Sequence, residues 1–180
     1  MMAVQPIREK DKIEQMKTVL MHSSYRDYFL FCFGINTGLR ISDILPMKVK
    51  DIKGKTHIIL KETKTRKSKR LKLTPVAQRL VEDYVEGLHD EDYLFPSKKG
   101  GKPISRVQAY RVLNAAAEKV GIGEIGTHTL RKTFGFHFYQ QYKDVVLLQE
   151  IFNHSAPSVT LRYIGINDDI MDKAIDGFGL

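Results

Sequence analysis

The segment SYRDYFLFCFGI, residues 24–35, carries apolar side chains on nearly every face of a helix. Ser23 and Ser24 precede it and the acidic Asp27 lies in its first turn, a pattern typical of a helix start. A helix that is apolar all round has to be buried on every side. We therefore expect this helix at the centre of the fold, ending at the glycine-containing break at residues 36–38.

Composition places the chain among ordinary globular proteins. Its 180 residues are 42% hydrophobic and 28% charged, which suits one domain with a buried core. The single cysteine, Cys32, excludes an intramolecular disulfide and a multi-cysteine zinc site, and its apolar neighbours predict a buried side chain. Residues 1–17 lack the apolar core of a secretory signal, and no run approaches the roughly 18 apolar residues of a membrane span. We expect a cytoplasmic protein without a membrane partner.

Outward from the central segment, the pattern predicts more helices and one small sheet. Three short strands of an antiparallel sheet are expected at residues 49–52, 56–62 and 70–73. Helices are expected at residues 39–45, 75–88, 105–121, 128–142, 145–153, 158–164 and 168–176. The sequence has no internal repeat and no interdomain linker, so residues 1–180 are predicted to form one α+β domain that is mainly helical.

Positive charge is concentrated in the predicted sheet. The window from Lys53 to Lys72 holds nine basic residues against one acid, Glu62, and its charge of +8 equals the formal net charge of the whole chain. Such a cluster is typical of proteins that bind a polyanion, because neutralised phosphates release their counterions. The alternative is a solvated basic hairpin that serves solubility.

Two motifs carry arginines suited to phosphate. In GLRISD, Arg40 follows a glycine break and Asp43 lies three residues on, where it could orient the guanidinium. The same spacing also suits a surface ion pair. In HTLRKTF, His128 and Arg131 share one face at the amino terminus of a predicted helix, where the helix dipole favours an anion. The alternative there is a capped helix with a polar face.

A third region holds a candidate nucleophile. His154 follows Asn153 in the tripeptide NHS, and Tyr163 lies nine residues further on. A tyrosine flanked by Leu161 and Ile164 on a short helix is ordinarily a packing residue, which is the alternative here. Beside the arginine motifs and the basic hairpin, however, a phenol points to DNA strand cleavage through a covalent tyrosine link.

These motifs, in this order, resemble the tyrosine recombinase or phage integrase family over residues 25–165. The segments that carry the resemblance are GLRISD, ETKTRKSKRLKLT, HTLRKTF, NHS and LRY. The resemblance implies the catalytic-domain fold of DNA breaking-rejoining enzymes, here α+β with a small three-stranded sheet. It implies a site-specific recombinase or integrase that forms a 3′-phosphotyrosyl link with double-stranded DNA. It also implies a homo-oligomer, a tetramer, on DNA, with a monomer as one state of the free protein, and it implies no cofactor or metal ion.

The resemblance also assigns roles to the three motifs. Arg40 and Arg131 match the pair that clamps the scissile phosphate. His128 matches the residue that takes or relays the tyrosine proton. His154 matches a further hydrogen-bond donor to the phosphate.

Tyr163 matches the nucleophile, and Lys64 in the hairpin matches the lysine that protonates the leaving 5′ oxygen. A small register shift would put Arg66, Lys67 or Lys69 in the place of Lys64. We expect the hairpin to bind DNA through its other basic residues: Lys61, Arg66, Lys67, Lys69 and Arg70.

Two features depart from the family pattern. Asn153 stands where the family has a glycine, although Asn tolerates left-handed backbone geometry better than most residues. Only about 24 residues precede the central helix, so the helical core-binding domain that family members carry is expected to be absent from this chain. Such a chain would form half of a DNA clamp and bind DNA weakly, with a strong salt dependence.

Other functions remain open on sequence alone. A type IB topoisomerase shares the tyrosine chemistry but rejoins the same strand. A catalytically silent relative would bind DNA and modulate a full-length recombinase. Residues 168–176 predict an acidic amphipathic helix, which packs either on a neighbouring subunit or on its own domain.

Overall fold

The structure, a computed structural model, describes residues 4–61, 68–123, 125–126, 128–166 and 168–179. Its helices are α1 (Lys10–Ser23), α2 (Tyr25–Thr37), α3 (Ile41–Ile44), α4 (Val49–Ile52), α5 (Pro75–Val85), α6 (Arg106–Lys119), α7 (Thr129–Tyr142), α8 (Val145–Phe152), α9 (Pro157–Tyr163) and α10 (Asp168–Asp176). Two strands, β1 (His57–Lys61) and β2 (Ser68–Lys72), pair as an antiparallel hairpin. None of the described helices is both long and apolar enough to span a membrane.

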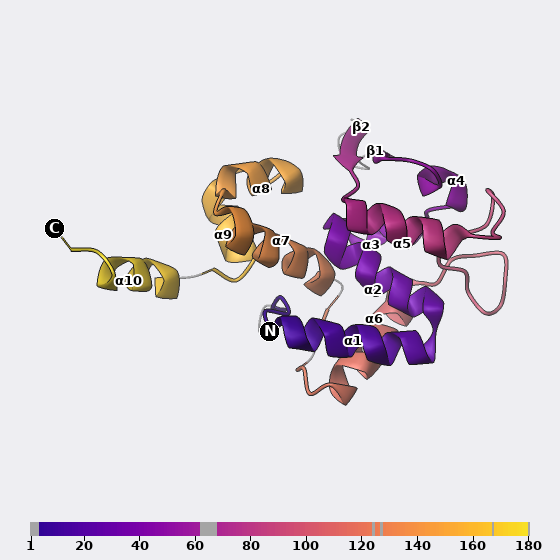
Figure 1. Ribbon diagram of the computed structural model, residues 1–180, viewed down its shortest axis with the longest axis horizontal. Coiled ribbons are helices and arrows are strands. Elements are labelled where there is room, and N and C mark those ends of the chain that lie inside the picture. The colour runs from indigo at the N-terminus through magenta and orange to yellow at the C-terminus, as the bar shows by residue number, and fades with distance from the viewer. Residues whose placement is uncertain (1–3, 62–67, 124, 127, 167, 180) are drawn as a thin grey trace.

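Helix α2 lies at the centre of the fold, as its apolar sequence predicts. Residues 29–33 are each at most 1% exposed, and each buried phenylalanine among them contributes about 2 kcal/mol. The Ser24 side chain caps the helix by accepting a hydrogen bond from the Asp27 N–H. Helices α1, α5, α6 and α7 pack around α2 (Figure 1). Phe29 stacks on Tyr84 of α5 with ring centroids 3.9 Å apart, which ties α5 to the centre.

The predicted first strand, at residues 49–52, is wrong. This segment forms the short helix α4 because the Asp51 carboxylate accepts a hydrogen bond from the Lys48 N–H at 2.8 Å and caps the first turn. Val49 and Ile52, three residues apart, lie on one face of this turn and are buried. In the described part of the chain the sheet therefore has two strands, β1 and β2.

Helix α1 is an element that the sequence pattern did not predict. Its sequence is rich in charged residues, and only Ile13, Met16 and Leu20 are buried among its described residues. These three residues lie three and four positions apart, so they line one face, and that face packs on α2 and α6. A stripe of three apolar residues is enough for a helix that covers an existing core.

Helix α7 connects the central helices to a smaller apolar cluster formed with α8 and α9. A Cβ on Gly135 of α7 would lie 2.7 Å from the side chains of Phe152 and Ile164, so only glycine allows this approach. Leu148, Phe152 and Ile164 are buried in the cluster. Because α8 packs on both α7 and α9, it fixes the two relative to each other, whereas α10 extends away from them in Figure 1.

Candidate active site

His128 and Arg131 lie at the beginning of α7, as predicted. The Arg131 side chain is buried, and its guanidinium donates hydrogen bonds to the Gly38 carbonyl at 2.7 Å and the Phe152 carbonyl at 2.8 Å. The guanidinium carbon lies 4.1 Å from the centroid of the Phe152 ring. Burial lowers the pKa of Arg131 to about 10, so the group stays charged at neutral pH. Two neutral carbonyls thus fix this cation without neutralising it.

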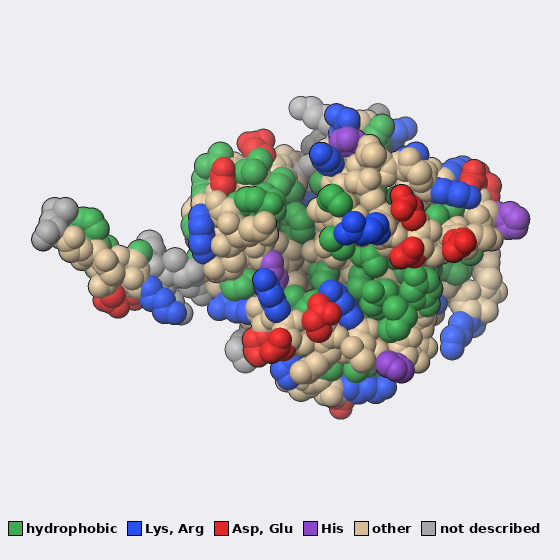
Figure 2. Space-filling model, in the orientation of Figure 1, with side chains coloured by type: hydrophobic (Ala, Val, Ile, Leu, Met, Phe, Trp, Pro, Cys, Tyr) green, Lys and Arg blue, Asp and Glu red, His purple; other side chains and the backbone are tan. Residues whose placement is uncertain are grey.

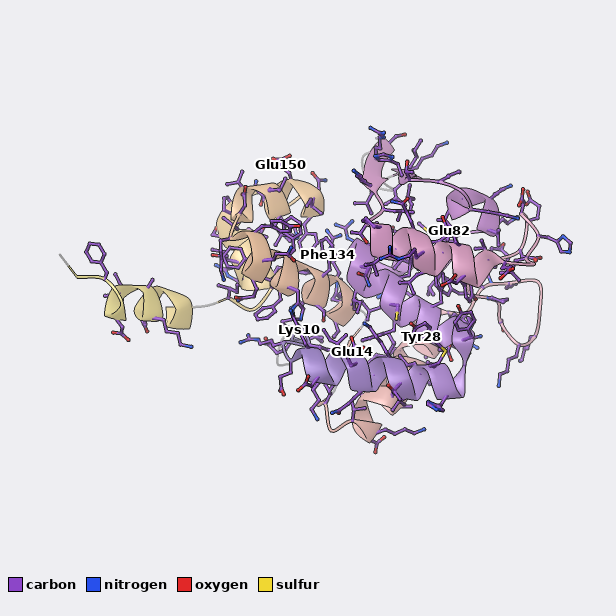
Figure 3. The ribbon with its side chains drawn as sticks, in the orientation of Figure 1. Lys10, Glu14, Tyr28, Glu82, Phe134 and Glu150 are labelled. Carbon is purple, nitrogen blue, oxygen red and sulfur yellow. The ribbon has the colours of Figure 1, made fainter. Side chains whose placement is uncertain are left out.

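Gly38, which supplies one of these carbonyls, terminates α2 in the left-handed conformation with φ 65°. The Phe134 ring of α7 covers it so closely that a Cβ on Gly38 would lie 2.5 Å from the ring (Figure 3 labels Phe134). Both the backbone angle and the space therefore require glycine. The glycine break before Arg40 consequently also positions Arg131.

Tyr163 is the last residue of α9 and faces the beginning of α7. Its hydroxyl lies 3.3 Å from Nδ1 of His128, and the nearby Arg131 guanidinium lowers the pKa of the phenol through its positive charge. The ring centroid lies 5.0 Å from that of His154 and 5.6 Å from that of Phe152. The fold therefore brings four predicted site residues together around one phenol: His128, Arg131, His154 and Tyr163 itself.

The Tyr163 phenol is protonated at neutral pH. Burial raises its pKa above the ordinary 10.0, and the positive charges of Arg131 and Arg40 oppose this rise. A protonated phenol attacks poorly until a base accepts its proton. The His128 nitrogen at 3.3 Å is within reach of that proton.

His128 is suited to be that base because its imidazole is neutral at pH 7. Its pKa is lowered from 6.5 by partial burial of the ring and by four nearby cations: Lys132, Arg106, Arg131 and Arg40. The residue is the N-cap of α7 and retains an exposed edge. An incoming substrate can therefore reach the same face that holds Tyr163.

Arg40 immediately precedes α3 and is exposed. Its charge acts on Arg131 and Tyr163 alike, which places its guanidinium at the same site. The predicted ion pair with Asp43 is not formed among the described side chains. Arg40 has extended backbone angles (φ −69°, ψ 143°), so the two side chains do not share a helix face. The negative charge of Asp43 instead raises the pKa of Arg131, which stabilises the charged form of that guanidinium.

His154 is held beside Tyr163 by two polar contacts. Its Nδ1 lies 2.9 Å from Oγ1 of the buried Thr160, and the Gln149 side-chain amide donates to the His154 carbonyl at 3.1 Å. Asn153 before it ends α8 in the left-handed conformation, with φ 54°. The expectation that Asn tolerates the geometry of the family glycine is therefore confirmed, and the turn presents His154 to the site.

The basic hairpin is described only in part. Three of its predicted functional residues lie outside the described residues: Lys64, Arg66 and Lys67. Lys61 of β1 and Arg70 of β2 are exposed, and the strand register places them on the same face of the hairpin. Lys69 pairs with Leu60 in that register, and its side chain is not described. Lys and Arg side chains gather near the hairpin, at the top of the view in Figure 2.

Lys132 and Arg106 belong to the site and were missed by sequence reasoning. Lys132 Nζ lies 5.1 Å from the centroid of the Tyr163 ring and donates a hydrogen bond to the Val4 carbonyl at 2.7 Å. Arg106, the first residue of α6, lowers the pKa of His128 through its charge. Lys132 is part of the HTLRKTF motif, but its position beside Tyr163 depends on a hydrogen bond to Val4, which is distant in sequence. For Arg106, the only feature in the sequence was its position directly after Ser105, the predicted helix cap, which does not indicate a functional residue.

The assembled site has the groups that an attack on a phosphodiester requires. Fixed guanidinium groups can neutralise negative charge that develops on phosphoryl oxygens. A neutral imidazole and a phenol in contact can supply the base and the nucleophile. The arrangement therefore suits covalent chemistry on an anionic ester.

Comparison with known proteins relates the whole chain to one family. A sequence model described as the phage integrase family matches residues 8–169. Probable integrase/recombinase YoeC of Bacillus subtilis (strain 168) is 51% identical over 176 residues, which cover 98% of this chain and 97% of that protein. Tyrosine recombinase XerD of Corynebacterium glutamicum is 30% identical over 84% of this chain and 52% of its own length. The chain thus spans about half of XerD.

Solved structures share the fold at low sequence identity. The crystal structure of XerA recombinase aligns with a TM-score of 0.77 and 20% identity, over 97% of this chain and 63% of that one. The structure of XerH site-specific recombinase bound to palindromic difH substrate aligns with a TM-score of 0.74 and 19% identity, over 94% of this chain and 51% of that one. The predicted catalytic-domain fold is therefore confirmed. With a family match over most of its length and a relative that is half identical from end to end, the chain belongs to the phage integrase family of tyrosine recombinases.

Proposed function

We propose that this chain is a site-specific recombinase or integrase that cleaves and rejoins DNA strands through Tyr163. The observation that carries the proposal is the position of the Tyr163 hydroxyl, 3.3 Å from Nδ1 of His128 and near enough to Arg131 for the guanidinium charge to lower the pKa of the phenol. A nucleophile, a base and a phosphate ligand meet at this one atom. A tyrosine kept only for packing has no need of either partner.

In the first step, the Tyr163 oxygen attacks phosphorus in line with the 5′ oxygen and its proton passes to His128. The new phosphorus–oxygen bond forms as the bond to the 5′ oxygen breaks, and Lys64 supplies the proton that the leaving oxygen takes up. The products are a 3′-phosphotyrosyl link and a free 5′ hydroxyl. In the second step, the 5′ hydroxyl of a partner strand attacks this link as its proton passes to Lys64, and Tyr163 leaves as it takes its proton back from His128. One phosphodiester is broken and one is formed, so the cycle needs no energy-supplying cofactor.

The charges of the site fit the transition state of this reaction. At pH 7 fewer than about 1 in 1,000 phenols with a pKa of 10 or above are ionised, so attack depends on His128 as a base. Negative charge develops on the phosphoryl oxygens during attack, and in this proposal Arg131, Arg40 and His154 neutralise it. Removal of one such preorganised donor costs on the order of 10²-fold in rate.

Double-stranded DNA is the proposed substrate. XerH is bound to difH substrate in its structure, and the Tn1549 transposon integrase is in complex with circular intermediate DNA. In this chain the exposed Lys61 and Arg70 on one face of the hairpin suit contacts to sugar-phosphate backbone. The chain spans about half of XerD, so the activity of the whole protein on DNA is part of the proposal. A cytoplasmic site of action is also part of the proposal.

We further propose that four copies assemble on DNA and that α10 packs on a neighbouring copy. This helix extends away from α7–α9 in Figure 1, and Ile175 and the following Phe178 are 71% and 70% exposed. Apolar groups left in water favour a partner surface. The double variant Ile175→Asp with Phe178→Asp should keep single-strand cleavage and lose the tetramer, as measured by light scattering of the protein–DNA complex.

A covalent trapping assay tests the proposed function. The protein is incubated with a pool of nicked suicide duplexes whose sequences are randomised on both sides of the nick, and adducts are recovered under denaturing conditions and sequenced. We expect an adduct with a preferred sequence that is absent in Tyr163→Phe. No adduct from either protein contradicts the enzyme. Relaxation of supercoiled plasmid by the monomer, without sequence preference, would identify a topoisomerase instead.

A further inference from the structure

Residues 4–8, which we call the N-terminal strap, run without helix or strand structure across α7. The Ile7 N–H donates a hydrogen bond to Thr133 Oγ1 at 2.9 Å, and the Ile7 carbonyl lies 2.9 Å from Nε2 of His137. Ile7 is also buried. The strap is thus fastened to the helix that carries His128, through both backbone polar groups of one residue.

The strap also holds the turn that follows Tyr163. Arg8 donates a hydrogen bond to the Gly165 carbonyl at 2.8 Å, and its guanidinium lies 5.3 Å from the centroid of the Phe136 ring. A Cβ on Gly165 would lie 2.8 Å from the Gln5 side-chain oxygen and 3.0 Å from the Arg8 guanidinium. Gly165 lies just beyond the end of α9, so this contact bears on the end of the helix where Tyr163 lies.

Lys132 provides a second connection between the strap and Tyr163, because it contacts both. The Lys132 ammonium donates to the Val4 carbonyl at 2.7 Å and lies 5.1 Å from the centroid of the Tyr163 ring. The Val4 side chain packs on Gly126, where a Cβ would lie 2.7 Å from it. Gly126 precedes His128 by two residues. The strap therefore contacts the segments on both sides of the gap between His128 and Tyr163.

We propose that the N-terminal strap is a positioning element for strand cleavage: Arg8 and the Val4 carbonyl hold Tyr163 at its working distance from His128. The inference rests on the proposed function of Tyr163. Arg8 acts through Gly165 and not on the reacting atoms, so it is a positioning residue. A slightly misplaced nucleophile lowers the rate of the chemical step while substrate binding is retained.

Cleavage kinetics of Arg8 variants test this proposal. On the duplex recovered by covalent trapping, Arg8→Ala should lower the single-turnover cleavage rate about tenfold, with the DNA dissociation constant changed less than about twofold. Arg8→Lys should restore most of the rate, because an ammonium can still donate one hydrogen bond to the Gly165 carbonyl. Arg79→Ala, which removes an exposed arginine from α5, is the matched control and should cleave like the wild type.

Amide hydrogen exchange on the DNA-free protein gives an independent readout. Gly165 and Ile166 donate backbone hydrogen bonds to residues of α9, and their amides should exchange about tenfold faster in Arg8→Ala, while α2 is unchanged. Arg8→Lys should restore the slower exchange. Unchanged exchange at these amides, or equal cleavage rates for Arg8→Ala and Arg79→Ala, would overturn the proposal. If the wild type forms no adduct, the proposed function fails and the role of the strap in cleavage fails with it. The exchange measurement then still decides whether Arg8 holds the turn after Tyr163.

Discussion

His128 and Tyr163 lie 35 residues apart in the chain, yet Nδ1 of His128 is 3.3 Å from the Tyr163 hydroxyl and the two rings are nearly perpendicular at 89°. Helix packing causes this approach: α7 begins after His128, α9 ends with Tyr163, and α8 packs on both. Gly135 of α7 admits the side chain of Ile164, which directly follows Tyr163. A proton can pass between two groups at this distance with little motion. The pair is therefore the centre of the proposed mechanism.

Cleavage should depend on the neutral form of His128. Because the pKa of His128 is lowered below 6.5, the second-order rate constant of cleavage should be highest near pH 8 and fall as the pH drops through that lowered pKa. His128→Gln should remove this fall and lower the rate by about 10²- to 10⁴-fold. His22→Gln, on the exposed face of α1, is the control. A midpoint above pH 7 would contradict the assignment of His128 as a base.

The two arginines should separate stability from chemistry. Arg131→Ala leaves the buried carbonyls of Gly38 and Phe152 without their donor and should lower the free energy of unfolding by about 2 kcal/mol. Arg40→Ala removes an exposed side chain and should change it by less than about 0.5 kcal/mol. Both should lower cleavage by on the order of 10²-fold. Urea unfolding measures the change in stability, and covalent trapping measures cleavage. Equal losses of stability in the two variants would contradict the claim that Arg131 is buried and structurally important while Arg40 is exposed.

Asn153 should be replaceable by glycine but not by alanine. Asn153 has a positive φ, so Asn153→Ala should cost about 1 kcal/mol and shift His154, while Asn153→Gly should stay within about 0.5 kcal/mol of the wild type. Lys143, the other non-glycine residue described with positive φ, is a matched control: Lys143→Gly should leave cleavage unchanged. Urea unfolding and the cleavage rate test this together. Equal stability of Asn153→Ala and Asn153→Gly would speak against a required left-handed geometry.

DNA binding should be strongly dependent on salt. If Lys61 and Arg70 each neutralise one phosphate, Lys61→Ala and Arg70→Ala should each reduce the slope of log affinity against log salt by about 1. Lys10→Ala, at the start of α1, should leave the slope unchanged. Fluorescence anisotropy with a labelled duplex at several salt concentrations provides the measurement. Unaltered slopes in both hairpin variants would remove this surface from the interface.

Sequence patterns correctly predicted those helices whose apolar spacing and capping residues both lie within one short segment. The central helix was predicted from its apolar run and Ser24 cap, and both are present. Residues 49–52 were mistaken for a strand because this short segment begins and ends with the β-branched Val49 and Ile52. Their spacing of three instead suits the helical turn that the Asp51 carboxylate closes. Helix α1 was missed because three buried residues give a weak periodic signal.

The candidate site was predictable as a set of motifs but not as a set of contacts. Asp43 was assigned to Arg40 from sequence spacing, while its charge acts on Arg131, far along the chain. Lys132 and the strap residue Arg8 contribute through partners that only the fold brings near. Sequence spacing identifies neighbours on one element, and tertiary packing decides which elements meet.

The central claim is that the Tyr163 oxygen becomes covalently bonded to DNA. Mass spectrometry of peptides from the trapped complex tests it most directly, after nuclease digestion has reduced the DNA to a short remnant. The account predicts a nucleotide remnant on the peptide that contains Tyr163, and none on any peptide of Tyr163→Phe. A remnant on a different residue, or no remnant when the complex survives denaturation, would contradict the account.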